Sequence, residues 1–138
     1  MAWKIAIAFL SVVLVMALGI SLLVERACDP CGNEELKTIL SPDAKLKAVI
    51  FQRDCGATTG FSTHVSLLSS SKKPPREPGN TFILDTDRGR APTGPGGGPE
   101  VILRWVDERV LLVKYDKRAR IFRSERSVDR ITIRYNPQ

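Results

Sequence analysis

The last third of the chain alternates apolar and polar residues, and this pattern restricts the fold more than any other feature. In the segment 130–135, RITIRY, Ile131, Ile133 and Tyr135 occupy alternate positions, and polar residues occupy the positions between them. Successive side chains of a strand point to opposite faces of a sheet, so such alternation is typical of a sheet with one buried and one solvated face. The segment therefore favours antiparallel β-structure.

Short segments of this kind recur at hairpin spacing, separated by turn-forming residues, and no long amphipathic helix lies among them. The expected strands cover residues 36–40, 45–53, 61–68, 81–85, 100–105, 110–115, 119–123 and 130–135. The pattern predicts an all-β domain, which is a small antiparallel sandwich or bent sheet of seven to eight short strands. We expect two four-stranded meanders, one on each side of the glycine-rich segment.

The apolar positions of these strands predict one modest core, and about 105 residues suffice to build it. Its expected members are Leu46, Ala48, Ile50, Val65, Leu67, Ile83, Leu103, Trp105, Leu112, Ile121, Ile131 and Ile133.

The N-terminal segment contains a run of 20 residues without a charge, from Ile5 to Val24. A helix of that length reaches about 30 Å, the thickness of the hydrocarbon core of a bilayer. The run predicts a transmembrane helix that acts as a signal anchor and contacts the lipid bilayer through residues 5–24. A cleaved signal peptide with its site at residues 17–19 is the alternative. The anchor implies a single-pass protein of the cytoplasmic (inner) membrane, with its C-terminal domain outside the cytoplasm.

The expected organisation is therefore a signal anchor at residues 1–26, a connector at 27–35 and a β-domain at 36–138. Within the domain, the proline-rich segment 69–80 is predicted to be a flexible loop. The same is predicted for the segment 88–100, which holds five glycines and three prolines.

The net charge of +6 lies mostly in the C-terminal third, where ten Lys and Arg residues in 101–138 face five Asp and Glu residues. Because the basic residues alternate with apolar ones, the pattern favours solvated strand faces over a dedicated binding patch. A protein or an anionic envelope component is the partner that this charge would favour, and nucleic acid is disfavoured.

Three cysteines stand at positions 28, 31 and 55, and two of them would pair in an exported domain. The connector can bring Cys31, or alternatively Cys28, to Cys55 beside a turn. Such a bridge would close a loop of about 25 residues and stabilise the domain by roughly 3 kcal/mol. The following segment GATTG predicts a structural turn formed by Gly56, Thr58, Thr59 and Gly60.

Three chemical alternatives use the same residues. Cys28 and Cys31 form a C-x-x-C motif, but thiol-redox chemistry also needs a helix N-terminus that activates the thiol. Both cysteines, with Cys55 and His64, could form a Cys₃His zinc site, although the second spacing is wider than usual. His64 lies among serines on the face expected to be polar, which favours a solvent-facing histidine over a catalytic one. We predict no catalytic residue, metal or other cofactor.

The segment 41–68 resembles the signature of an uncharacterised bacterial family, written SPDGK, an apolar strand, RDCGATT and T-x-V-S. The matching positions are Ser41, Pro42, Asp43, Lys45, Arg53 through Thr59, Thr63, Val65 and Ser66. The resemblance implies an N-terminal membrane segment and a small β-rich domain, with no known activity. Ala44 stands where the family has glycine, so the turn must avoid a positive φ there or carry strain.

These features favour a membrane-anchored binding or interaction module of unknown activity outside the cytoplasm. Two alternatives are an envelope enzyme that uses His64 or the pair Cys28 and Cys31 for thiol-redox or other chemistry, and a toxin-neutralising or envelope-stress partner protein.

Overall fold

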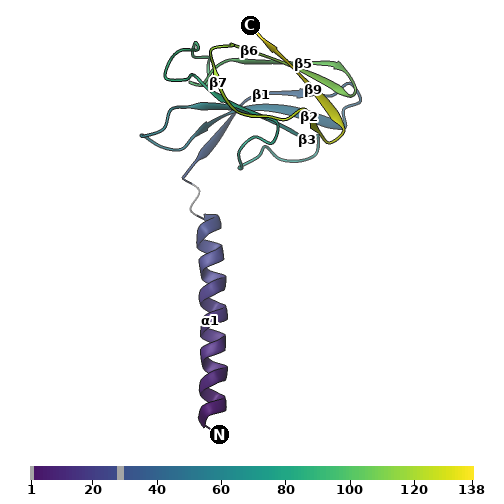
Figure 1. The fold of residues 1–138 in the computed structure, drawn as a ribbon. Helices are drawn as coiled ribbons and strands as arrows, with labels where there is room; N and C mark the ends of the chain where they lie inside the picture. The colour runs from purple at the N-terminus through teal and green to yellow at the C-terminus, as the bar shows by residue number, and fades with distance from the viewer. Residues whose placement is uncertain (1, 28–29) are drawn as a thin grey trace. The chain divides into compact units, whose positions relative to one another are not determined.

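The computed structural model describes residues 2–27 and 30–138. The chain divides into two compact units, Met1–Pro30 and Cys31–Gln138. The first unit is one helix, α1 (Ala2–Ala27), and the second is built from β-strands (Figure 1).

The prediction of a transmembrane signal anchor is wrong. A single span needs about 20 consecutive apolar residues in one helix. In the part of the chain that the structure describes, no helix combines the length and the apolar character that crossing a membrane requires. The single-pass inner-membrane localisation, with the domain outside the cytoplasm, was deduced from that span and is corrected with it.

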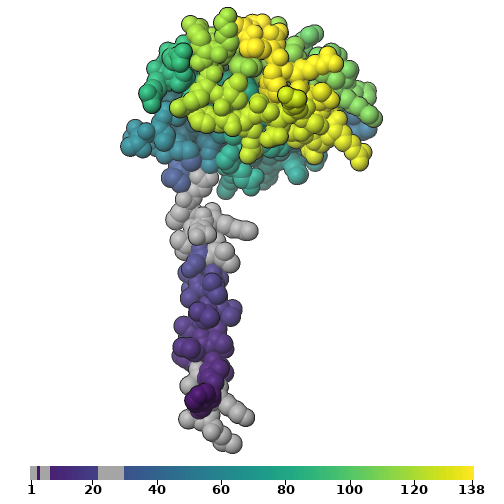
Figure 2. Space-filling model, viewed as in Figure 1, coloured from purple at the N-terminus to yellow at the C-terminus, as the bar shows by residue number. Residues whose placement is uncertain are grey.

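The second unit is a sandwich of two sheets (Figure 1). In spatial order, the first sheet contains β1 (Gly32–Leu40), β2 (Leu46–Asp54), β3 (Ser62–Ser69), β4 (Phe82–Asp85) and β7 (Arg120–Ser124). The second sheet contains β5 (Val101–Asp107), β6 (Val110–Tyr115), β9 (Ile131–Pro137) and β8 (Ser127–Val128). In the space-filling view, the C-terminal segments in yellow-green and yellow form much of the face turned to the viewer (Figure 2).

The sheets differ from two separate antiparallel meanders in two ways. Strand β7 comes from the second half of the chain but pairs with β4 of the first sheet. Strands β6 and β9 pair in parallel. A parallel pair needs a crossover of a dozen or more residues, and residues 116–130 supply it by passing along the first sheet before they return. Strand β1 also begins at Gly32, inside the segment 27–35 that was expected to be a connector.

The core lies between the sheets and draws on both. Its buried members are Ala48, Ile50, Val65, Leu67, Phe82, Leu84, Val101, Leu103, Leu111, Val113, Ile131 and Ile133.

Five expected core residues do not belong to this buried set. Ile83 and Leu112 are only half-buried, because their neighbours in the sequence take the inward positions. Ile121 is 41% exposed on the edge strand β7, which has a neighbouring strand on one side only. Leu46 and Trp105 pack against the core while partly exposed.

Candidate functional site

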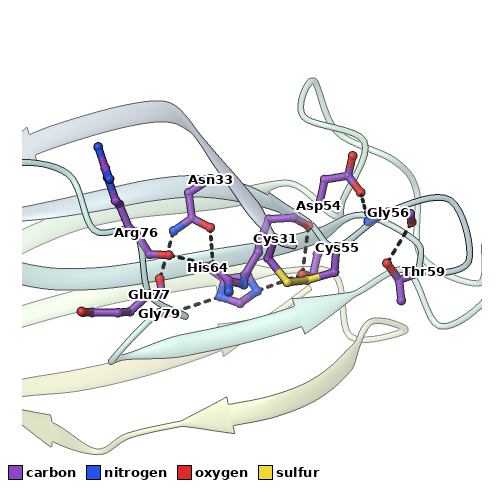
Figure 3. Close-up of a disulfide and its surroundings, with 12 residues drawn as sticks. Cys31, Asn33, Asp54, Cys55, Gly56, Thr59, His64, Arg76, Glu77 and Gly79 are labelled. Atoms are coloured by element: carbon purple, nitrogen blue, oxygen red, sulfur yellow. Dashed lines mark hydrogen bonds between the residues drawn. A yellow bond between two sulfur atoms is a disulfide. The ribbon is translucent and has the colours of Figure 1, made fainter. Parts of the chain in front are cut away.

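A disulfide joins Cys31 to Cys55, the first pair that the sequence suggested (Figure 3). The bond links the residue before β1 to the residue after β2, and neither sulfur is then a free thiolate. The Cys₃His zinc set needs both thiolates, so the disulfide excludes it in this state. Cys28, the alternative partner, lies outside the described residues. Among the described residues, no group of three His, Cys, Asp or Glu side chains is placed to hold a metal ion.

The segment after the disulfide is a tight turn closed by local hydrogen bonds (Figure 3). Gly56 has φ +105°, in the region that favours glycine, and its N–H donates to the Asp54 carboxylate at 2.9 Å. The N–H and hydroxyl of Thr59 both donate to the Gly56 carbonyl at 3.1 Å. Thr58 and Gly60 are exposed. These contacts give the turn a structural role.

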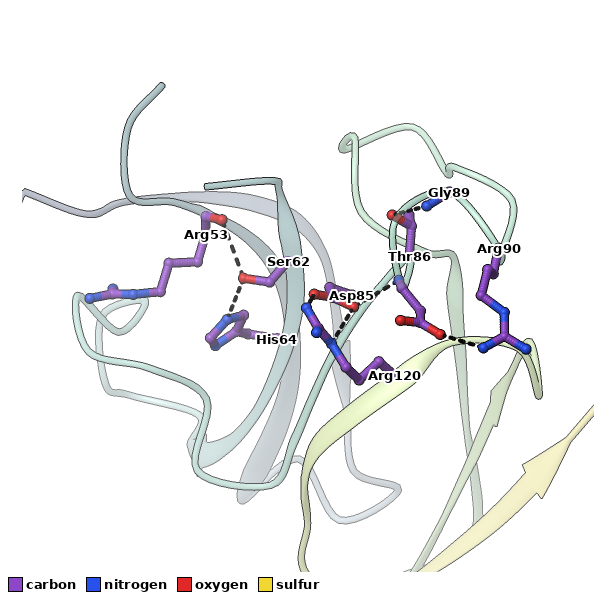
Figure 4. A network of polar contacts seen from close by, with 9 residues as sticks. Arg53, Ser62, His64, Asp85, Thr86, Gly89, Arg90 and Arg120 are labelled. Carbon is purple, nitrogen blue, oxygen red and sulfur yellow. Dashed lines mark hydrogen bonds and ion pairs between the residues drawn. The ribbon is translucent and has the colours of Figure 1, made fainter. Parts of the chain in front are cut away.

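His64 is buried, with 4% of its surface exposed, and the prediction of a solvent-facing side chain is wrong. Alternation correctly places it on the outer face of the first sheet, because Thr63 and Val65 face the other way. However, residues 75–80 lie over that face. The Gly79 N–H donates to His64 Nδ1 at 2.9 Å, and His64 Nε2 lies 2.8 Å from Ser62 Oγ (Figures 3 and 4).

These contacts fix the tautomer of the imidazole and exclude a catalytic Ser–His pair. Since Nδ1 accepts the Gly79 N–H, the neutral ring carries its proton on Nε2 and donates to the Ser62 hydroxyl. A general base would have to present a lone pair to that hydroxyl instead. Burial, followed by the charges of Arg53 and Arg123, lowers the pKa of His64 from 6.5 to about 4.

A buried arginine holds the covering segment in place. The Arg53 side chain is 6% exposed and donates from one terminal nitrogen to Asn33 Oδ1 at 2.7 Å and to the Arg76 carbonyl at 2.9 Å. The Asn33 amide donates to the carbonyls of Pro75, at 2.9 Å, and Glu77, at 3.0 Å. The sequence showed only a proline-rich segment here. The asparagine and arginine that hold it lie more than 20 residues away and could not be assigned to it.

The glycine-rich segment packs closely against the first sheet. A Cβ at Gly96 would lie 2.6 Å from a Leu36 methyl group, and a Cβ at Gly97 would lie 2.5 Å from the Phe61 ring. Beside this segment is a cleft of about 180 Å³ at the open edge of the sandwich. Residues of both sheets and of the glycine-rich segment line it, among them Leu36, Ile50, Thr63, Pro95, Pro99 and Val101.

The outer face of the second sheet presents cations around an apolar centre. In the strand register, Arg104 on β5 and Arg134 on β9 flank Leu112 on β6, and Ile102 is paired with Lys114. We call these five residues the basic face. Arg104 and Arg134 are exposed, Lys114 and Leu112 are half-buried, and 51% of the Ile102 surface is exposed.

The cations of the basic face lack acidic partners. Within residues 2–27 and 30–138, none of its three cations forms an ion pair with a carboxylate. By contrast, Arg118 and Arg120 on the neighbouring segment pair with Asp116 and Asp85. The alternating pattern predicts solvated strand faces for these basic residues, because local alternation does not show that three strands lie side by side.

Comparisons with family models, with curated proteins and with solved structures find no match for this chain. The resemblance of segment 41–68 to a bacterial family therefore remains a prediction.

Proposed function

We propose that the protein is a non-enzymatic interaction module that binds an acidic protein segment on its basic face. The observation that carries this proposal is the placement of three cations around Leu112, none of which is ion-paired with a carboxylate among the described residues. Two observations disfavour the enzyme alternatives. The imidazole of His64 is buried in one fixed tautomer, and Cys31 is bound in a disulfide.

The geometry of the sheet sets the kind of partner. Neighbouring strands lie about 4.8 Å apart, so the backbones of Arg104 and Arg134 are separated by roughly 10 Å across β6. An extended segment whose carboxylates alternate with apolar side chains could reach both guanidinium groups and place an apolar group on Leu112. Arginine favours such contacts, because its planar donors match a carboxylate in pairs.

A protein surface suits this face better than a nucleic acid does. Single-stranded nucleic acids bind through aromatic side chains on which bases stack. The aromatic residues of the second sheet, Trp105, Tyr115 and Tyr135, pack against the core. Three cations would also neutralise few phosphates, and duplex binding draws most of its strength from that neutralisation.

The proposal is tested with a fluorescent 12-residue peptide of alternating Glu and Leu, titrated with the full chain and followed by anisotropy. The test variant carries Arg104→Glu, Lys114→Glu and Arg134→Glu. The matched control carries Lys72→Glu, Lys73→Glu and Arg88→Glu, which change the net charge equally at exposed positions away from the basic face.

We expect the test variant to bind at least about tenfold more weakly than the wild type, since attraction becomes repulsion at three sites. The control variant should retain most of the affinity. Equal losses in the two variants would show that net charge alone drives binding and would contradict the proposal. Equally tight binding of an oligothymidylate by the wild type would also contradict it.

A further inference from the structure

Residues 75–80, which we call the strap, cross the outer face of the first sheet and are held by polar groups of several strands. The Asn80 N–H donates to Ser66 Oγ at 3.1 Å, and the Asn80 side-chain amide donates to the Leu67 carbonyl at 2.8 Å. Arg123 on β7 donates to the Gly79 carbonyl at 2.9 Å. The strap also receives the bonds from Asn33 and Arg53 described above.

The outer face of the first sheet buries apolar side chains, and we attribute their burial to the strap, because it is bonded to their strand partners His64 and Ser66. Val49 and Phe51 lie on the outer face of β2, yet their exposed fractions are 0% and 1%. The ring of Phe51 lies 5.3 Å from the imidazole of His64. This face therefore forms a second buried layer outside the main core, and the layer depends on the strap staying closed.

His64 is the titratable group at the centre of that layer, and its charged surroundings are unfavourable to a proton. Arg53 on β2 and Arg123 on β7 both raise the cost of a positive ring. The nearest carboxylate of β4, Asp85, is paired with Arg120. Glu77 of the strap is exposed and contributes its carbonyl, not its carboxylate, to the contacts described.

We infer that the strap is an acid-released cover, which opens over the outer face of the first sheet when His64 takes up a proton. A proton on Nδ1 removes the only atom of the ring that can accept the Gly79 N–H. It also places a third positive charge beside Arg53 and Arg123 in a buried site. Opening relieves both costs, because the ring then meets water, and it uncovers Val49 and Phe51.

The lowered pKa of His64 in the closed state determines how pH shifts the equilibrium between the closed and the open strap. In the open state His64 has its ordinary pKa of 6.5 and binds a proton below that pH. In the closed state it binds a proton only near pH 4. The stability of the closed state is therefore complete above pH 6.5 and falls as the pH drops toward 4. Between pH 7.5 and pH 5 the ratio of open to closed strap rises about 30-fold.

Amide hydrogen exchange measured by NMR on the full chain tests this device. The probe is the Gly79 N–H, and the exchange rate at each pH is corrected for the intrinsic rate. Two turn amides that are far from His64 in the sequence serve as internal controls: the N–H of Ala44, bonded to Ser41, and that of Gly97, bonded to Gly94. The chain has one histidine, so the imidazole signals report its tautomer and titration without ambiguity.

We expect the protection of Gly79 to fall about 30-fold from pH 7.5 to pH 5, while the two control amides change little. His64→Asn retains an acceptor near Nδ1 but cannot titrate, and it should remove most of this dependence. If that variant does not fold, the wild-type comparison still decides the question. Constant protection of Gly79 across this range, or a simultaneous loss at Gly79 and in the core strand β3, would overturn the inference.

Discussion

Cys31 and Cys55 form a disulfide that joins the start of β1 to the end of β2 across 24 residues of sequence. Replacing both residues with serine should lower the free energy of unfolding by about 3 kcal/mol, because the unfolded chain regains the freedom that the bond removes. Urea denaturation of the full chain measures the change.

Cys28→Ser is the control for this prediction, since the disulfide joins the other two cysteines and does not include Cys28. The control should unfold at the same urea concentration as the wild type. A loss of stability in the control equal to that of the double variant would contradict this account of the cysteines.

The backbone of Ala44 adopts φ +55°, in the left-handed region that favours glycine. The turn is held there because the Ala44 N–H donates to the Ser41 carbonyl at 2.8 Å, and the Ser41 hydroxyl bonds Asp43 at 2.7 Å. Ala44→Gly should stabilise the domain by about 0.5–1 kcal/mol, because relief of strain outweighs the added freedom of the unfolded chain. A lower melting temperature for this variant would contradict the assignment of strain.

Gly98 lies where a side chain has no room. A Cβ there would approach Thr63 Oγ1 to 2.5 Å and the Thr63 backbone nitrogen to 2.9 Å, and the same hydroxyl donates to the Pro99 carbonyl at 2.7 Å. Gly98→Ala should therefore cost about 2 kcal/mol or more. Gly60→Ala, where a Cβ would meet nothing within 4 Å, is the matched control and should be nearly neutral. Equal stabilities of the two variants would show that the glycine-rich segment can shift to accommodate the added methyl group, and this would contradict the prediction.

Much of the sheet structure is visible in the sequence, because alternation is a local signal. Ile131 and Ile133 face the core as their spacing indicates. In continuous apolar runs the same signal fails. At residues 82–84, FIL, the pattern cannot tell whether Ile83 or its two neighbours point inward. The neighbours do, since the register of the sheet is set by pairing with other strands.

The features that decide the candidate sites depend on distant pairings. His64 is buried by a segment about 15 residues later, and that segment is held by Asn33, more than 40 residues before it. The basic face requires β9 to return beside β6 in parallel, and local pattern does not encode that crossover. The N-terminal prediction is wrong for a different reason, because a run of uncharged residues does not by itself establish a membrane span.

Reciprocal charge exchange tests the central claim, that the basic face binds an acidic segment, most directly. The anisotropy titration is repeated with a 12-residue peptide of alternating Lys and Leu, using the wild type and the variant that carries Glu at positions 104, 114 and 134. The account predicts that the variant binds the Lys peptide and rejects the Glu peptide, and that the wild type does the reverse. Binding of both peptides by both proteins with similar affinity would contradict it.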